Sequence, residues 1–231
     1  MAIVIGAGAL PGPQPAWAKA GVYGVLRTGA AVPSDMNYAK AINSDLLLDL
    51  GTGWAVGGAI GYQFNQPLRA ELSFDYLDAS LKGTYRENGF FVTCGTFANQ
   101  PCLGPAVNGG VKAWSGFAMG YYDIDLGGLV SPYIGAGLGL VRMGLDVKTT
   151  ARLNVGTSRP FAIVDDRDAV LGYRLASGIA FDVGPTKVDV SYTYIRTNTP
   201  SLAGIGSAIP TFTFDRRLRS HGITAGIRFG F

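Results

Sequence analysis

The last ten residues of the chain, from Gly222 to Phe231, alternate strictly between apolar residues and small or polar ones. The apolar positions, at every second residue back from the end, are Phe231, Phe229, Ile227, Ala225 and Ile223. A period of two predicts a β-strand with one apolar face and one polar or crowded face. Soluble sandwiches contain such strands too, so the fold depends on how often the pattern returns.

The pattern returns in seven earlier segments, each long enough for a tilted membrane crossing. These segments are residues 19–32, 54–64, 68–82, 111–126, 132–148, 168–183 and 187–196. Long connections over 33–52, 83–110, 149–167 and 197–213 alternate with tight turns at 65–67, 127–128 and 184–186. This order predicts an up-and-down antiparallel meander with both termini at the end that carries the tight turns.

Composition indicates what the apolar faces contact. Charged residues make up only 15% of the chain, against roughly 25% in an ordinary soluble domain, and no run of eighteen apolar residues provides a helical span. A closed barrel in lipid accounts for both facts, because closure leaves no unpaired strand edge. We therefore expect an all-β, eight-stranded, up-and-down antiparallel transmembrane β-barrel with four long extracellular loops and short periplasmic turns. The net charge of +3, without a Lys/Arg block, argues against nucleic-acid binding.

The first residues and the two cysteines indicate export. Ile3 to Leu10 is a short apolar run, and Ala16-Trp17-Ala18 has the A-x-A form of a cleavage site. We expect residues 1–18 to be a signal-peptide remnant, with an ordinary N-terminal tail as the alternative, and residues 19–231 to form the barrel domain. In an oxidising compartment, Cys94 and Cys102 are expected to form a local disulfide. With one His and two Cys, a zinc site has too few such ligands, and we expect no cofactor.

Charged residues gather opposite the apolar faces, and we expect them in the barrel lumen. They are Arg27, Arg69, Glu71, Asp75, Lys112, Asp123, Arg174, Asp182, Lys187, Asp189 and Arg228. Eight strands enclose an interior about wide enough for side chains to fill, and buried opposite charges must pair. We predict that these residues form a charge network that largely plugs the lumen. A narrow ion path lined by the same residues is the alternative.

Two segments carry less regular patterns. Over residues 111–126 we expect Val111, Phe117, Met119 and Tyr121 to share the outward face, with Lys112 inside. In the next segment the apolar phase changes near Leu140, which predicts a β-bulge.

Aromatic residues are expected near the strand ends, and basic residues at the external end of the last strand. Outward aromatic positions at strand ends predict a girdle at the lipid headgroups, formed by Trp54, Tyr62, Tyr76, Tyr121, Tyr173 and Tyr194. Arg216, Arg217 and Arg219 begin the last strand and are candidates for contact with anionic lipopolysaccharide, although a solvated basic rim also explains them. Ser220 and His221 cannot act together as nucleophile and base, because adjacent strand residues point to opposite faces.

Several short motifs occur in order along nearly the whole of residues 19–231. They are Gly61-Tyr62-Gln63-Phe64, Leu68-Arg69-Ala70-Glu71-Leu72, Met119-Gly120-Tyr121-Tyr122-Asp123-Ile124, Pro132-Tyr133-Ile134-Gly135-Ala136-Gly137-Leu138-Gly139 and the terminal Phe231. With these motifs the chain resembles the opacity-type or OmpA-like eight-stranded outer-membrane barrels, most of all the proteobacterial surface-antigen members. The resemblance implies a place in the outer membrane of a Gram-negative bacterium. It also implies insertion by the outer-membrane assembly machinery, with Phe229 and Phe231 as the C-terminal signal.

The resemblance supplies no activity, since members of the family are adhesins, structural proteins or small pores. We predict a structural or surface-interaction protein without catalysis, in contact with outer-membrane lipid and lipopolysaccharide, whose loops meet the environment or a protein partner. Apolar loop residues are the contact candidates, namely Phe90, Phe91, Phe97, Leu202, Ile205 and Ile209. A small-solute porin-like channel is the alternative, and a soluble lipocalin-like carrier is a third.

Overall fold

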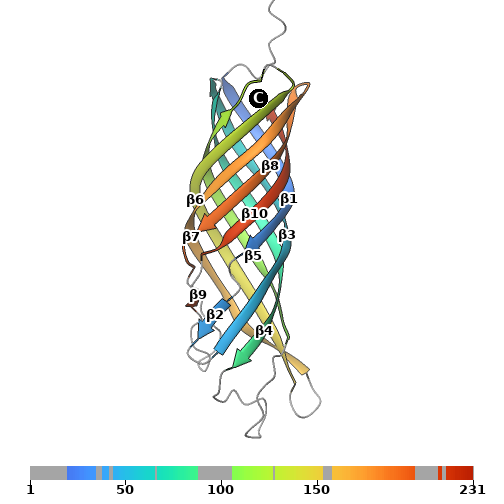
Figure 1. Cartoon of the computed structure of the whole chain (residues 1–231), viewed down its shortest axis with the longest axis vertical. Coiled ribbons are helices and arrows are strands. Elements are labelled where there is room, and N and C mark those ends of the chain that lie inside the picture. Colours follow the sequence, from blue (N-terminus) through green and yellow to red (C-terminus); the bar gives the residue numbers. More distant parts are fainter. Residues whose placement is uncertain are drawn as a thin grey trace, which may run out of the picture.

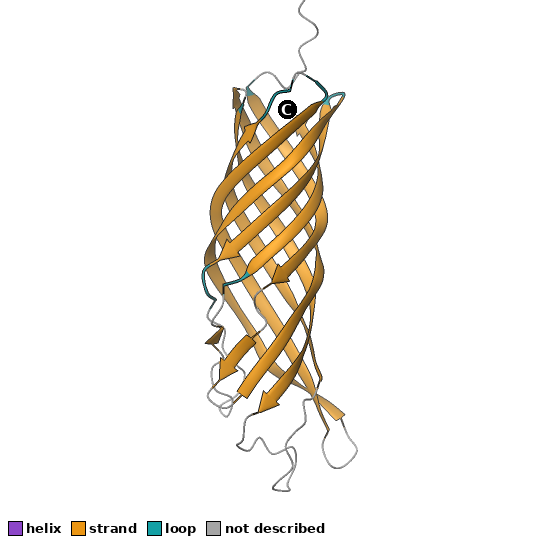
Figure 2. Ribbon diagram, in the orientation of Figure 1, coloured by secondary structure: helices purple, strands orange, loops and turns teal. Residues whose placement is uncertain are grey.

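The computed structural model describes residues 20–34, 38–41, 44–65, 67–87, 106–126, 128–152, 158–200, 213–214 and 217–230. These residues form strands and turns (Figure 2), and none of them belongs to a helix long and apolar enough to cross a membrane. The strands are β1 (Gly21–Ser34), β2 (Tyr38–Ala41), β3 (Ser44–Asn65), β4 (Leu68–Glu87), β5 (Ala106–Asp123), β6 (Val130–Arg152), β7 (Ser158–Val183), β8 (Thr186–Thr197), β9 (Thr213–Phe214) and β10 (Arg219–Gly230).

Strand β1 closes the sheet into a barrel, because it pairs with β3 on one side and with β10 on the other. Every pairing between neighbours is antiparallel, so β1, β3 to β8 and β10 form an eight-stranded up-and-down barrel (Figure 1). The short strands β2 and β9 extend the sheet beside β3. The predicted barrel is confirmed, and β10 ends beside the tight turns that join β3 to β4 and β7 to β8.

At the opposite end, the five strands β3 to β7 extend far beyond the length that a membrane crossing requires. Strand β7 has 26 residues and β6 has 23, whereas roughly 9–11 residues suffice for a tilted crossing. Pairing between β6 and β7 continues to Arg152 and Ser158, so most of the segment 149–167 is strand and the expected long loop there is wrong. Strands β8 and β10 have 12 residues each. The barrel wall is therefore tall along β3 to β7 (the tall side) and low along β8, β10 and β1 (the low side) (Figure 1).

An aromatic cluster on the outer face marks the edge of an apolar belt, on the side away from the tight turns. The ring of Tyr76 lies 5.5 Å from that of Trp54 and 4.7 Å from that of Trp114. Between this level and the tight turns, exposed outward residues are almost all apolar, among them Val56, Ile60, Leu72, Phe74, Leu138, Leu140, Leu171, Leu175, Ile223 and Ile227. These residues form the lipid-facing belt of the barrel. Beyond the aromatic cluster, exposed outward residues include Lys82, Lys112, Arg142, Asp146 and Lys148.

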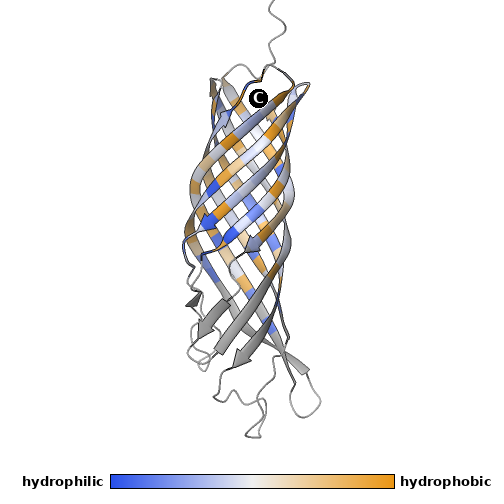
Figure 3. Ribbon diagram, viewed as in Figure 1, coloured by the Kyte–Doolittle hydropathy of each residue, from blue (hydrophilic) through white to orange (hydrophobic). Residues whose placement is uncertain are grey.

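At the level of the aromatic cluster, the inward-facing residues change from charged to apolar. On the tall side, above the aromatic cluster, the buried inward residues are apolar, namely Leu81, Val111, Val141, Met143 and Leu145. The strands of the tall side therefore carry apolar residues outside within lipid and inside beyond it, and Figure 3 shows apolar and polar residues alternating along the strands. Strand β6 keeps unbroken register with β5 through Leu140, so the expected β-bulge is wrong. The apolar residues change face there because the outside of the strand leaves lipid, without an inserted residue.

Cysteine labelling in whole cells tests where the belt ends. In a background with Cys94 and Cys102 replaced by serine, Lys148→Cys is expected to react with a membrane-impermeant maleimide, because this side chain is exposed beyond the belt. Leu138→Cys is expected to stay unlabelled, because it lies in the lipid-facing belt. Equal labelling of the two positions would contradict the assigned boundary.

Candidate functional site

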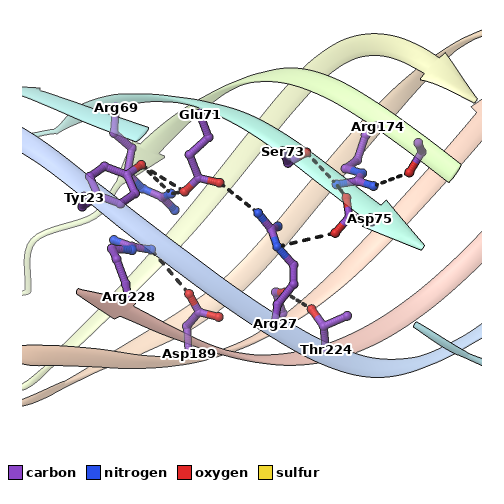
Figure 4. A network of polar contacts seen from close by, with 12 residues as sticks. Tyr23, Arg27, Arg69, Glu71, Ser73, Asp75, Arg174, Asp189, Thr224 and Arg228 are labelled. Carbon is purple, nitrogen blue, oxygen red and sulfur yellow. Dashed lines mark hydrogen bonds and ion pairs between the residues drawn. The ribbon is translucent and has the colours of Figure 1, made fainter. Parts of the chain in front are cut away.

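The described charged residues that point inward gather in the half of the barrel that lies within the lipid belt. They come from β1, β4, β5, β7, β8 and β10, which bring together residues far apart in the sequence (Figure 4). We call this set the lumen network. It contains Arg27, Arg69, Glu71, Asp75, Asp123, Arg174, Asp182, Lys187, Asp189 and Arg228.

Arg69 and Glu71 form the centre of the network, two positions apart on the inward face of β4. Nη1 of Arg69 is paired with Glu71, and Nε of Arg69 lies 3.0 Å from Oδ1 of Asp123 on β5. The hydroxyl of Tyr23 on β1 donates a hydrogen bond of 3.0 Å to Glu71. The guanidinium of Arg69 also lies over the ring of Tyr121, 3.9 Å from its centroid. Arg69 is therefore held by two carboxylates and an aromatic face, the combination that a buried cation needs.

Arg27 and Arg174 extend the network across the lumen through Asp75. Nη2 of Arg27 lies 3.3 Å from Oε2 of Glu71, and Nε of Arg27 lies 3.7 Å from Oδ1 of Asp75. On the far wall, Nη1 of Arg174 lies 2.7 Å from Oδ2 of Asp75 and donates to the hydroxyl of Ser73 at 3.1 Å. The chain Glu71–Arg27–Asp75–Arg174 thus joins β4, β1 and β7 across the barrel interior (Figure 4).

The low side supplies a second group of polar contacts. Nη2 of Arg228 lies 3.5 Å from Oδ2 of Asp189, and the hydroxyls of Ser191 and Thr224 lie 2.8 Å apart. Nearer the tight turns, Nζ of Lys187 lies 3.0 Å from Oδ1 of Asp182. Apart from Lys112, every residue expected in the lumen network has an oppositely charged partner within 4 Å.

Two small spaces lie among the described residues of the lumen. One, of about 10 Å³, is lined by Arg27, Arg69, Glu71 and Asp189 among others, and is near the minimum that a single water needs. The other, of about 60 Å³, lies between Asp75 with its two arginines and the apolar side chains of the outer half, such as Leu77 and Val141. Arg27 lines both spaces. The two are small pockets on either side of an ion-pair layer, and neither is a wide channel.

Glycines opposite large side chains make room for this packing. Tyr121 on β5 is paired in register with Gly135 on β6, and Tyr23 on β1 with Gly61 on β3. A Cβ atom added at Gly135 would lie 2.2 Å from the Tyr121 ring, and one at Gly61 would lie 2.2 Å from the Tyr23 ring. Each inward tyrosine therefore lies across the glycine of the neighbouring strand.

The same arrangement explains why the expected facing of β5 is wrong. Phe117, Met119 and Tyr121 are buried inside, whereas Lys112 is exposed on the outer face and is not part of the lumen network. Their partners on β6 are three glycines, Gly139, Gly137 and Gly135, which leave space for large side chains. Tyr121 consequently does not belong to the outer aromatic girdle. The G-x-G-x-G pattern of the following strand was the signal that indicated the correct face.

Other predicted residues are placed as follows. Ser220 is buried and His221 is exposed, so the two side chains lie on opposite faces of β10. Phe229 faces outward, with its ring against Gly24 on β1. The disulfide candidates, the loop contact candidates, Arg216 and Phe231 lie outside the described residues, as do residues 1–18.

Sequence reasoning missed the inward aromatic residues of the network. Tyr23 and Tyr133 are buried, and Arg228 lies over both rings, 5.4 Å and 5.9 Å from their centroids. The inward direction of both tyrosines could have been predicted, because each lies on the face that carries charged or glycine residues within its own segment. An inward tyrosine in a charged lumen is consistent with its polar tip and with the cation-binding face of its ring.

Comparisons with known proteins agree with this fold. Solved structures that are similar include Neisserial surface protein A, with a TM-score of 0.53, 20% identity and coverage of 92% of this chain and 99% of that one. OprG from Pseudomonas aeruginosa has a TM-score of 0.54, 12% identity and coverage of 93% and 98%. At these identities the likeness concerns the fold alone.

Curated relatives lie closer in sequence. An uncharacterized protein of Brucella abortus (strain 2308) is 29% identical over 167 residues, which are 67% of this chain and 54% of that protein. The chain therefore spans about half the length of that relative. A protein of Rickettsia massiliae (strain Mtu5) named "Putative adhesin" is 27% identical over 212 residues, covering 88% of this chain and 85% of the relative.

The family comparison covers the entire sequence. The chain matches the family described as "Outer membrane protein beta-barrel domain" over residues 1–231. Together with the closed eight-stranded barrel and its apolar belt, this match places the protein in the outer membrane of a Gram-negative bacterium. The chain belongs to the outer membrane protein β-barrel domain family.

Proposed function

We propose that this protein is a structural, surface-interaction barrel with a closed lumen, which carries its loops above the membrane and has no catalytic role. The observation that carries the proposal is the inversion of polarity along the strands, with charged residues outside and apolar residues inside beyond the aromatic cluster. A barrel wall with charged residues on its outer face and apolar residues in its interior is stable in water. The tall side therefore serves as a rigid support that holds the loops away from the lipid surface.

The packing of the interior supports a closed lumen over a porin-like channel. Within the belt, the lumen network connects opposite walls through Arg27, Asp75 and Arg174. Beyond it, Leu81, Val111 and Met143 are almost completely buried. A hydrated ion has to displace both layers to cross, and the two small spaces beside the ion pairs hold only a few waters.

Planar bilayer recording tests the closed lumen. The purified protein is expected to give no steady single-channel conductance, because ion pairs and then an apolar core fill the path. A known porin inserted under the same conditions serves as the positive control. Steady conductance from protein whose folding is confirmed by its heat-modifiable mobility would favour the channel.

The surface role concerns loop residues outside the described part of the chain. Phe90, Phe91 and Phe97 in one loop, and Leu202, Ile205 and Ile209 in another, remain the proposed contact residues, since exposed apolar residues often mark contact surfaces. The relative named "Putative adhesin" supports this choice. Cells that display the chain are expected to be retained on an epithelial monolayer above the vector control, and serine at all six positions is expected to abolish the gain. Retention unchanged by the six substitutions would contradict the proposed contacts.

The non-catalytic part of the proposal rests on the opposed placement of Ser220 and His221. His221 lies instead among tyrosines, with its Nδ1 2.6 Å from the hydroxyl of Tyr192. Hydrolysis of phospholipid or lipid A by the purified barrel, lost on His221→Ala, would overturn it.

A further inference from the structure

We propose that the outer face of β3 to β6 binds a phosphorylated sugar of the lipopolysaccharide that surrounds the barrel. The place is the edge of the lipid-facing belt on the tall side, where the aromatic cluster meets the first charged residues beyond lipid. We call this set of residues the sugar site. It contains Trp54, Tyr76, Asp78, Lys112, Trp114 and Arg142.

Two tryptophans supply the apolar surface of the sugar site. Trp54 and Trp114 are 54% and 63% exposed, and the rings of both pack against the ring of Tyr76. Their partner Tyr76 is only partly exposed, so it supports the two tryptophans from within the cluster. Exposed aromatic rings held in this way offer a large apolar surface on which the C–H face of a sugar ring can pack.

Polar groups that can bind sugar hydroxyls and phosphate adjoin the rings. Oδ2 of Asp78 accepts a hydrogen bond of 3.3 Å from the hydroxyl of Tyr76, which orients the carboxylate. Lys112 is paired in register with Asp78, and Arg142 with Trp114. A carboxylate accepts hydrogen bonds from hydroxyl groups, and the planar guanidinium matches the geometry of phosphate oxygens. The chemistry of the site therefore fits a sugar that carries a phosphate.

The sugar site is accessible from the region beyond the belt. The next outward residues along β4 and β5 are Ser80 and Gly110, which are paired in register and are both small. A Cβ added at Gly110 would lie 3.5 Å from the carbonyl oxygen of Ala79, an ordinary contact distance. A sugar can therefore approach the rings from outside. The aromatic cluster marks the headgroup level of the outer leaflet, where lipopolysaccharide presents its sugars and phosphates.

The low side carries an aromatic group of a different composition. The rings of Tyr194 and His221 lie 5.1 Å apart, and Tyr194 is paired in register with His221 and Leu175, neither of which is acidic. An aromatic girdle at the lipid headgroups explains this group completely. The sugar site differs because it adds an oriented carboxylate and two cations to the rings.

Calorimetric titration of the full chain in detergent tests the site, with the phosphorylated inner-core oligosaccharide of lipopolysaccharide, freed of its lipid, as the probe. A girdle that contacts only lipid is not expected to bind this probe, because it has no acyl chains. Asp78→Asn is expected to weaken binding by roughly fivefold, because it replaces a charged acceptor by a neutral one. Trp114→Leu is expected to weaken binding by roughly tenfold, because the packing surface is lost.

Two matched controls separate the site from general effects of charge and aromaticity. Asp125→Asn removes the same charge from an exposed residue at the end that carries the tight turns, and Tyr194→Leu removes a ring from the low side. Both are expected to bind like wild type, and heat-modifiable mobility checks that every variant is folded. Absence of binding by wild type, unchanged binding by both site variants, or an equal loss in the controls would overturn the site.

The sugar is varied as well as the protein. Wild type is expected to bind the dephosphorylated oligosaccharide roughly tenfold more weakly, because the contacts of Lys112 and Arg142 with phosphate are lost. Equal binding of the two oligosaccharides would overturn the assignment of a phosphorylated sugar. A heparin fragment that binds as tightly as the phosphorylated oligosaccharide would indicate a site for an external sulfated glycan and would overturn the lipopolysaccharide assignment.

Discussion

Glu71→Ala is expected to destabilise the barrel by about 3–5 kcal/mol, the largest loss among single charge removals in the lumen. Glu71 accepts contacts from Arg69, Arg27 and Tyr23, and its side chain is 3% exposed. Its removal leaves two buried guanidiniums with one carboxylate fewer, which is more costly than replacing a complete pair by apolar residues. Urea unfolding in detergent, followed by the fluorescence of the belt tryptophans, measures the change.

A matched control separates burial from charge. Lys148 and Asp146 form a pair at a similar distance, but their side chains are 57% and 52% exposed. Removal of Lys148 is expected to change the free energy of unfolding by less than about 1 kcal/mol, because water screens exposed pairs. If Glu71→Ala changes stability as little as Lys148→Ala, the lumen network is not a structural element of the barrel.

Gly135→Val is expected to destabilise the barrel by about 3 kcal/mol, at the upper end of the usual cost of overpacking. A Cβ at this position would lie 2.2 Å from the ring of Tyr121, which is itself held under the guanidinium of Arg69. A shift of the ring would displace the guanidinium of Arg69, so the network has to rearrange. The folded fraction, measured by heat-modifiable mobility after refolding, is expected to fall sharply.

Gly120→Val provides the comparison on the outer face. The nearest atom to a Cβ added at Gly120 would be the carbonyl oxygen of Ala136, at 4.0 Å, and the position faces outward. This variant is expected to fold like wild type. The double variant Gly135→Val with Tyr121→Ala is expected to recover part of the lost stability, since the two residues are in contact. Equal loss in both glycine variants would contradict the proposed packing of tyrosine on glycine.

The strand number, antiparallel order and location were predictable from the sequence because each depends on a repeated pattern. The alternation along β10 and β8 is uninterrupted, and charged residues such as Arg69 and Asp189 stand opposite apolar ones. A buried ion has a strong preference for the side where partners are available. For this reason most members of the lumen network were assigned to the correct face.

The facing of β5 was not predictable from that strand alone. Phe117 and Met119 suit lipid and a packed interior equally well by hydropathy, and Lys112 alone pointed to the wrong face. The deciding factor is the neighbouring strand, where Gly137 and Gly139 leave space inside the barrel. The space available to a side chain inside the barrel depends on both neighbouring strands, so the periodicity of β5 alone does not predict its facing.

The extent of the tall side was missed for a related reason. The prediction assumed that a strand has one apolar face, so a change of phase near Leu140 was assigned to a bulge. In the structure the strand is regular, and its surroundings change from lipid to water. A phase change in the apolar pattern at the headgroup level therefore marks a strand that continues out of the membrane.

The change of the inward-facing residues from charged to apolar along the barrel also affects permeability. An ion that enters from the periplasmic end meets fixed charges such as Asp182 and Lys187, whereas one that enters from outside meets Leu81 and Met143 and has to lose its hydration shell. Added salt screens interactions between charges but does not weaken apolar packing. The outer half of the tube is thus expected to resist ion entry at any ionic strength, because its resistance depends on apolar packing and not on charge.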